Sequence, residues 1–124
     1  MKHLDARGLG EYHYDYDNDI AIFKVKEREY LKSIDFDNFV VDIDTEGFVV
    51  GMRIFDASKI LKIDKYGLKN MKQWEFNSKI EDNVISLQLR FSYIMRNKEI
   101  ITQGEDFIRE TIGAGVNSEV SCTA

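Results

Sequence analysis

The chain contains no proline, a single cysteine and two histidines in 124 residues. The lack of proline removes any proline-rich linker and leaves no strand interrupted by a missing backbone donor. Because Cys122 stands alone near the C-terminus, no intrachain disulfide and no cysteine-based metal cage can form. These absences favour one continuous fold in a reducing compartment.

Long apolar segments are also missing. No run approaches the roughly 18 apolar residues of a membrane helix, and residues 1–10 carry charges and glycines where a signal peptide is apolar. We therefore expect a cytoplasmic protein with no membrane segment. The formal net charge of −5 disfavours nucleic acid as a partner, because phosphate groups are repelled on average.

The remaining composition is that of a folded globular protein. Hydrophobic residues make up 44% and charged residues 31% of the chain, which excludes the disordered and fibrous classes. A chain of this length can bury about two-thirds of the surface of its unfolded form. We therefore expect residues 1–124 to form a single domain.

Alternating apolar and polar residues predict a hairpin in the second half. Every second residue is apolar over 85–95, and Trp74, Phe76 and Ile80 follow the same alternation, a period that is typical of half-buried strands. The small polar residues at 81–83 between these runs suit a turn. The two runs are therefore expected to pair as antiparallel strands.

A third strand is expected to follow a tight turn at 96–99. Two-residue turn geometry would place Arg90 opposite Glu105 and would suit a bulge at Gly104. For residues 105–112 we prefer a strand, and a short helix is the alternative.

The first half predicts five strands that are rich in aromatic and β-branched residues. Turn-forming aspartates and a glycine separate several of them. The runs cover residues 12–16, 20–26, 30–36, 39–43 and 48–55.

Between the two halves, apolar residues fall near one helical stripe over residues 57–71. The expected fold class is α+β and mostly antiparallel β, in one layered domain. Its parts are a five-strand meander (12–58), a short helical crossover (57–71), a three-strand meander (72–112) and a flexible tail (113–124).

Three segments of the first half carry a family resemblance. The tyrosine-rich and aspartate-rich residues 14–19, the Asp-x-Asp-x-x-Gly turn with a following glycine in 41–54, and Phe-Asp-Ala-Ser at 55–58 occur in order. This set resembles the domain of unknown function 2283 family over about residues 12–58. The resemblance implies a small, prokaryotic, strand-rich protein with no established reaction, in a family some of whose members are thought to be coupled to toxin-like partners. Arg53 departs from the glutamate that is common in that family.

Alternate aspartates offer a candidate metal site. Asp15, Asp17 and Asp19 resemble the opening of a calcium loop, in which several carboxylates share one tight turn. The match ends there, because Ile20 stands where the loop needs glycine and Lys26 where it needs a bidentate glutamate. A solvated hairpin turn is the preferred interpretation.

Other carboxylates are the candidate catalytic residues. Asp42, Asp44 and Asp56 would serve a hydrolase or transferase if two of them lay close together with perturbed pKa values. Aspartates beside hairpins are more often turn formers, so this interpretation is the weaker one. The two histidines are not placed in a catalytic set by any motif.

Lysines at three- and four-residue spacing mark the helical crossover. They would line one side of a helix and contact phosphate or an acidic partner. The preferred alternative is an ordinary solvated helix face, because no base-stacking aromatic residue is interleaved. The candidate partner-binding residues are Lys59, Lys62, Lys65 and Lys69.

The sequence therefore predicts a non-enzymatic binding or scaffold domain that needs no cofactor. We expect it to form homo-oligomers, preferably dimers, or to pair with another small protein such as an antitoxin-like partner. The alternatives are a carboxylate-based hydrolase, a metal-binding protein, and a regulator that contacts nucleic acid through the lysines.

Overall fold

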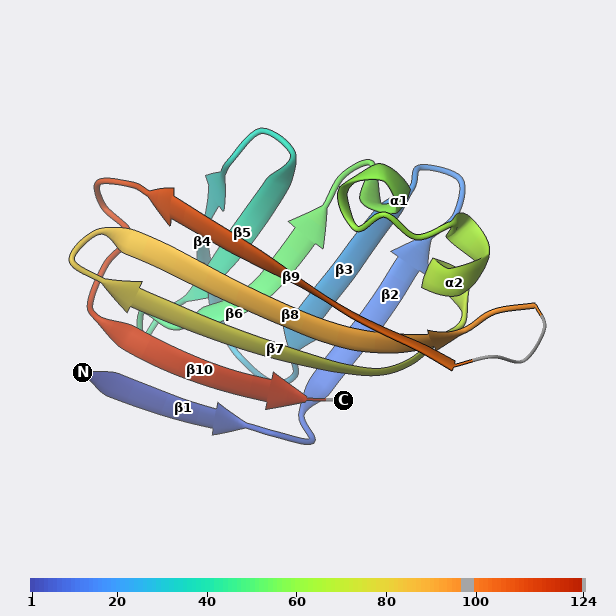
Figure 1. Ribbon diagram of the computed structural model, residues 1–124. Coiled ribbons are helices and arrows are strands. Elements are labelled where there is room, and N and C mark those ends of the chain that lie inside the picture. Colours follow the sequence, from blue (N-terminus) through green and yellow to red (C-terminus); the bar gives the residue numbers. More distant parts are fainter. Residues whose placement is uncertain (97–99, 124) are drawn as a thin grey trace.

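The computed structural model describes residues 1–96 and 100–123. Over these residues the chain is mainly antiparallel β structure in two five-stranded sheets, called sheets A and B (Figure 1). Helix is confined to two short segments, so "mainly β" describes the fold better than the predicted α+β class. The predicted tight turn at 96–99 falls largely outside the described residues.

Sheet B contains the five strands predicted in the first half. Their order in the sheet is β2-β3-β6-β5-β4. Strand β3 therefore pairs with β6, and the predicted simple meander, in which each strand pairs with the next one along the chain, is wrong. Gly47, with a φ of 90°, lies in the turn between β5 and β6. The strands are β2 (Gly10–Asp15), β3 (Ile20–Val25), β4 (Tyr30–Asp35), β5 (Phe39–Asp44) and β6 (Val49–Ile54).

Sheet A contains the predicted three-strand meander, formed by β7 (Met71–Glu81), β8 (Val84–Ile94) and β9 (Ile100–Glu110). The predicted register is wrong by one residue: Arg90 lies opposite Gly104, because the pairing starts with Ile94 opposite Ile100. The register of β9 is continuous through Gly104, so there is no bulge there. The strand that we preferred for residues 105–112 is confirmed as far as Glu110.

Two further strands complete sheet A. The order is β1-β10-β7-β8-β9, with β1 (Lys2–Ala6) parallel to β10 (Ser118–Thr123) and β10 antiparallel to β7. The expectation of a flexible tail over 113–124 therefore differs from the structure. Alternate residues Ser118, Val120 and Cys122 are buried, which explains why this polar segment forms a strand.

The predicted helix over 57–71 is two short helices, α1 (Ala57–Ile60) and α2 (Lys65–Lys69). Lys62, with a φ of 57°, interrupts the helical path between them. The Asp64 side chain accepts a hydrogen bond from the Gly67 amide at 2.9 Å and so caps α2. Gly67 therefore lies inside α2, where a Cβ atom would meet the Tyr93 ring at 2.7 Å.

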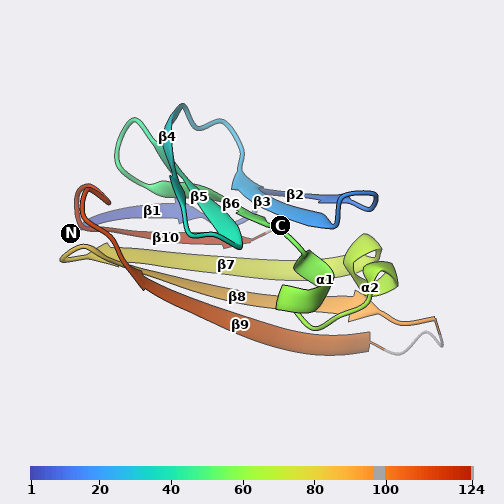
Figure 2. The same ribbon diagram turned by 90° about the horizontal axis from the view of Figure 1, so that it is seen from above.

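The inner faces of the two sheets pack against each other around one hydrophobic core (Figure 2). Phe23 of sheet B meets Trp74 of sheet A with ring centroids 5.2 Å apart, and Phe39 meets Phe107 at 4.9 Å. The helices lie at one end of the two layers (Figure 2). In the described part of the chain, no helix has both the length and the apolar character to cross a membrane.

Candidate functional site

The outer face of sheet A presents a broad polar surface. Its side chains alternate with the buried ones of the core, because successive residues of a strand point to opposite faces. Uncharged hydrogen-bonding side chains occupy the middle of this face. They are Gln73, Asn77, Ser86, Gln88, Ser92, Thr102, Ser121 and Thr123.

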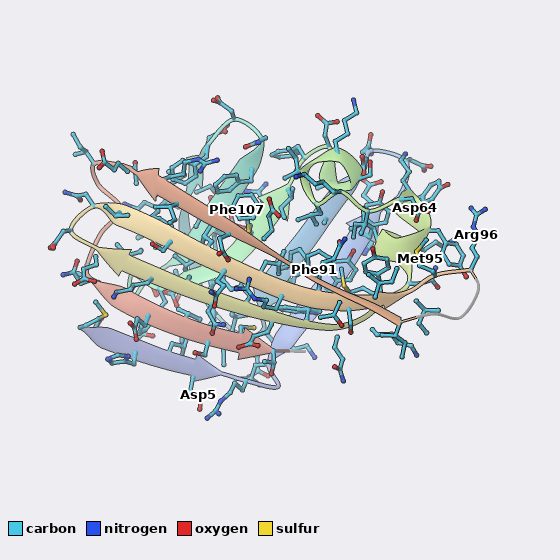
Figure 3. The ribbon with its side chains drawn as sticks, viewed as in Figure 1. Asp5, Asp64, Phe91, Met95, Arg96 and Phe107 are labelled. Carbon is cyan, nitrogen blue, oxygen red and sulfur yellow. The ribbon has the colours of Figure 1, made fainter. Side chains whose placement is uncertain are left out.

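Charged side chains lie among and around these uncharged ones, and acidic groups predominate. Six carboxylates of the described residues share the face with Lys79 and Arg90, and Arg90 lies directly opposite Glu75; Lys72 is exposed in the bulge at the start of β7. Arg7, in the turn after β1, adds a further cation at its rim, where it binds Asp5 at 2.7 Å (Asp5 is labelled in Figure 3). The carboxylates are those of Asp5, Glu75, Glu81, Asp106, Glu110 and Glu119.

Side-chain contacts on this face bridge neighbouring strands. Arg90 Nη1 of β8 lies 3.1 Å from Asp106 Oδ1 of β9, and Lys79 Nζ of β7 lies 4.0 Å from Glu119 Oε1 of β10. His3 Nδ1 of β1 lies 3.1 Å from Glu119 Oε2. Such exposed pairs contribute little to stability individually.

Shallow hollows lie along the outer face of sheet A. One of about 380 Å³ lies over Gln73, Arg90, Ser92 and Thr102, and another of about 400 Å³ lies over Asn77, Ser86 and Glu119. Both are wide open and lined by groups that donate and accept hydrogen bonds. This face suits a broad contact with a partner better than the enclosure of a small substrate.

The predicted catalytic residue Asp44 forms hydrogen bonds within the turn between β5 and β6. It is fully buried, and its Oδ1 accepts hydrogen bonds from the backbone amides of Glu46 and Phe48, both at 2.9 Å. Arg28 donates through Nε to Asp44 Oδ2 at 2.8 Å and also pairs with Glu46. The carboxylate therefore organises a turn and neutralises a guanidinium.

Asp42 and Asp56 have different surroundings. Asp42 Oδ1 accepts from the Ser33 hydroxyl at 2.7 Å and from Arg53 Nη2 at 2.9 Å, on the opposite layer of the molecule from sheet A. Arg53, the departure from the family pattern, thus pairs with a neighbouring strand. Asp56 is exposed, with a φ of 50°, and its side chain makes no cap hydrogen bond to α1. Asp42 and Asp44 therefore have separate partners, whereas Asp56 is exposed and has no such structural contact.

The three alternate aspartates of the candidate metal site also have different surroundings. Asp15 accepts from the Asn18 side chain at 2.9 Å, and this contact lowers the pKa of Asp15. Asp17 is exposed, and Asp19 is turned toward helix α1. Across residues 1–96 and 100–123, no cluster of three or more His, Cys, Asp or Glu residues is arranged to hold a metal ion.

The structure divides the lysines of the predicted stripe. Lys59 is exposed on α1 and Lys62 lies in the link between the helices, whereas Lys65 and Lys69 approach the ring of Tyr16 at 5.0 and 5.7 Å. An aromatic residue is therefore present beside two of the lysines, which the sequence did not indicate because Tyr16 is far away along the chain.

Close to these lysines, Arg96 lies 5.1 Å from the Tyr66 ring centroid. It is also near Asp64, the residue that precedes α2 (Figure 3). The Lys65 ammonium also donates to the Tyr16 carbonyl at 3.1 Å. The contacts of Lys65 and Lys69 with Tyr16 hold α2 against the β2–β3 turn, and the Arg96 contact holds α2 against the segment after β8.

Comparison with known proteins gives a family. Residues 11–58 match the family described as "Protein of unknown function (DUF2283)". An uncharacterized protein of Methanocaldococcus jannaschii is 35% identical over 106 residues, which is 85% of each chain. The chain belongs to the DUF2283 family. The resemblance stated from residues 12–58 is confirmed.

A second relative of this DUF2283 protein carries a functional name. A Methanosarcina mazei protein named "Putative hypoxanthine phosphoribosyltransferase" is 31% identical over 96 residues, 77% of each chain. No solved structure matches the chain.

The segment that defines the DUF2283 family coincides with sheet B and the start of α1. Asp19 explains part of its pattern: the Tyr14 hydroxyl donates to Asp19 Oδ1 at 2.7 Å, and the Ser58 hydroxyl donates to Asp19 Oδ2 at 2.6 Å. These family-pattern residues link β2, the β2–β3 turn and α1. In the structure these residues hold neighbouring elements together. All five strands of sheet A lie outside the matched segment.

Proposed function

We propose that this DUF2283 protein is a non-enzymatic binding domain that docks a basic protein partner on the outer face of sheet A. The observation that carries the proposal is the predominance of carboxylates on this face, six against the three cations Lys72, Lys79 and Arg90 within the strands, among amide and hydroxyl side chains. Complementary charge speeds association and selects among partners.

The alternative of a carboxylate enzyme has less support. Asp44 is bound by Arg28 and two backbone amides, and Asp42 is bound by Arg53 and Ser33. Both of these carboxylates therefore already make structural contacts. A general acid or base needs a group that is placed against a substrate and has a matched pKa.

Self-association is part of the proposal. A scaffold can present its binding face twice by forming a symmetric dimer, and symmetric dimers are the commonest protein assemblies. A cytoplasmic location is also proposed, because the single cysteine is buried and free.

The test is native mass spectrometry of the protein purified from its own host at low salt. We expect a stoichiometric complex with a second, basic protein, and we expect raised ionic strength to dissociate it. Glu75→Lys reverses a charge on the outer face of sheet A and should weaken the complex at least about tenfold. Glu11→Lys makes the same change on an exposed residue of β2 and should leave the complex intact.

Two results would contradict the proposal. One is a complex that Glu75→Lys and Glu11→Lys weaken equally, which would remove the outer face of sheet A from the interface. The other is turnover of hypoxanthine by the purified protein, the activity named for the Methanosarcina mazei relative.

A further inference from the structure

Strand β9 forms one edge of sheet A. It pairs with β8 on one side, and on the other side no described strand follows it in the sheet order. Figure 2 shows β9 as the outermost strand of its layer. At 11 residues, β9 is as long as the central strands β7 and β8 and longer than every other described edge strand.

This edge lacks most of the features that usually prevent strands from pairing with another molecule. Edge strands are commonly shortened, bulged, or occupied by proline or by charged residues, lysine above all. Ile100–Glu110 contains neither lysine nor proline, its charged residues fall in its second half, and its register with β8 is continuous. By contrast, the edge strand β4 has a register shift between Tyr30 and Lys32, and β1 has only five residues and begins with Lys2.

Two large apolar side chains lie on the outer face of β9. Ile100 is 67% exposed and Ile108 is 65% exposed, and both point to the same face because eight residues separate them. A distance of eight residues in one strand is about 27 Å, so the two side chains cannot cover each other. Ile100 lies opposite Ile94 of β8, and on the side away from β8 no described strand lies beside either isoleucine.

We infer that β9 pairs antiparallel with β9 of a second copy of this chain, about a two-fold axis at Gly104. On the outer face, Ile100 then lies opposite Ile108 of the second copy, and the same pair forms again on the other side of the axis. Each exposed isoleucine thereby gains an apolar cross-strand partner. This inference supplies the interface for the self-association in the proposed function.

The same register matches the other side chains of β9. Asp106 lies opposite Thr102, Phe107 opposite Ile101, and Glu105 opposite Gln103, so no pair has like charges. Moving the axis to Glu105 or to Asp106 would place two identical carboxylates opposite each other, which destabilises a strand pair. An axis at Gln103 would place Ile100 opposite Asp106. Charge and apolar contact therefore select Gly104.

Gly104 suits the axis for a geometric reason. A Cβ atom at this position would lie 2.6 Å from Arg90 Nη1, because the Arg90 side chain crosses over Gly104 on the outer face. In this position Arg90 reaches Asp106 at 3.1 Å. Near the proposed axis, the carboxylate of Asp106 therefore already has a counter-charge from its own chain.

The resulting dimer would join the two A sheets into one sheet of ten strands. Main-chain hydrogen bonds would supply most of the affinity, as in other strand-addition interfaces. The outer faces of both copies would be continuous, so a basic partner would meet twice the acidic surface.

The experiment measures mass by sedimentation from micromolar to hundred-micromolar protein. The wild-type chain should form a dimer. Ile100→Lys combined with Ile108→Lys places like charges opposite each other and should weaken the dimer at least about tenfold. Ile100→Lys combined with Ile108→Glu places opposite charges together in this register only, and should restore the dimer. Ile112→Lys changes an isoleucine that is 96% exposed beyond the end of β9 and should have no effect.

Three outcomes would overturn the inference. They are a wild-type chain that stays monomeric, a dimer that survives the double lysine change, and a double lysine variant that the lysine–glutamate pair does not rescue. Both isoleucines are exposed, so the variants should remain folded, and a thermal unfolding curve checks this. Glu75 lies on β7, away from the β9 edge, so Glu75→Lys should weaken the complex with the basic partner and leave the dimer intact, and the two proposals can fail separately.

Discussion

The Ser58 hydroxyl donates a hydrogen bond to Asp19 Oδ2 at 2.6 Å, and the Ser58 amide donates to Asp19 Oδ1 at 3.1 Å. The Ala57 amide adds a bond to the Asp19 carbonyl at 2.9 Å. These contacts fix the start of α1 against the turn between β2 and β3. Asp19 therefore acts as the N-terminal anchor for a helix that is 38 residues away from it along the chain.

We predict that Ser58→Ala destabilises the protein by about 1–2 kcal/mol, the typical value of a hydrogen bond to a charged group at a partly exposed site. Chemical denaturation of the variant and the wild type measures the difference. Ser121→Ala, on the exposed outer face of sheet A, is the control and should have little effect. Equal stability of Ser58→Ala and the wild type would show that the anchor is unimportant.

The same carboxylate should make stability depend on pH. Burial alone would raise the pKa of Asp19, but hydrogen bonds from Ser58 and Tyr14 hold it below its ordinary value of 3.8. A pKa that is lower in the folded state gives stability above the unfolded pKa, and this stability is lost as the pH falls through the folded pKa. Unfolding free energies measured below about pH 4 should therefore fall more steeply for the wild type than for Ser58→Ala. Parallel curves would contradict this.

Arg28 should be a strong determinant of stability. Its change to methionine leaves the fully buried carboxylate of Asp44 without its guanidinium, and breaking a buried pair in this way costs about 3 kcal/mol. The loss of the contact between Arg28 and the Phe48 ring, at 5.5 Å, acts in the same direction. Arg7→Met breaks the exposed pair with Asp5 and provides the matched control, with little expected change. Similar melting temperatures for the two variants would contradict the prediction.

Cys122 should react only when the protein unfolds. Burial in sheet A raises the pKa of its thiol from 9.0 to about 11, so the thiolate fraction at pH 8 falls about 100-fold. Labelling with a chromogenic disulfide should therefore be slow in buffer and fast in denaturant. Ser121→Cys places a second thiol on the neighbouring exposed position, which should react quickly in the folded protein. Rapid labelling of native Cys122 would refute its burial.

The local pattern predicted most strands but not their neighbours. Alternation over 85–95 identified β8, and aromatic runs identified the strands of sheet B, because both signals depend on adjacent residues. The pairing of β3 with β6 joins residues that are far apart along the chain, and no local period encodes it. The one-residue error at Arg90 arose from the assumed two-residue turn.

The candidate sites show the same limit. Aspartate clusters were visible in the sequence, but their partners Arg28, Ser33 and Ser58 come from distant segments. The segment over 113–124 was interpreted as a tail because it contains few large apolar residues. Its short alternation of Ser118, Val120 and Cys122 was the available signal for β10.

The position of β10 between β1 and β7 sets an order of events during synthesis. The ribosome makes β1 first, yet its neighbour in the sheet comes from residues 118–122. The first strand must therefore wait until residues 118–122 have emerged, while sheet B can pair its own strands earlier. Completion of sheet A thus depends on β10, so a chain that stops before β10 would leave the edge of β7 unpaired for chaperones to protect.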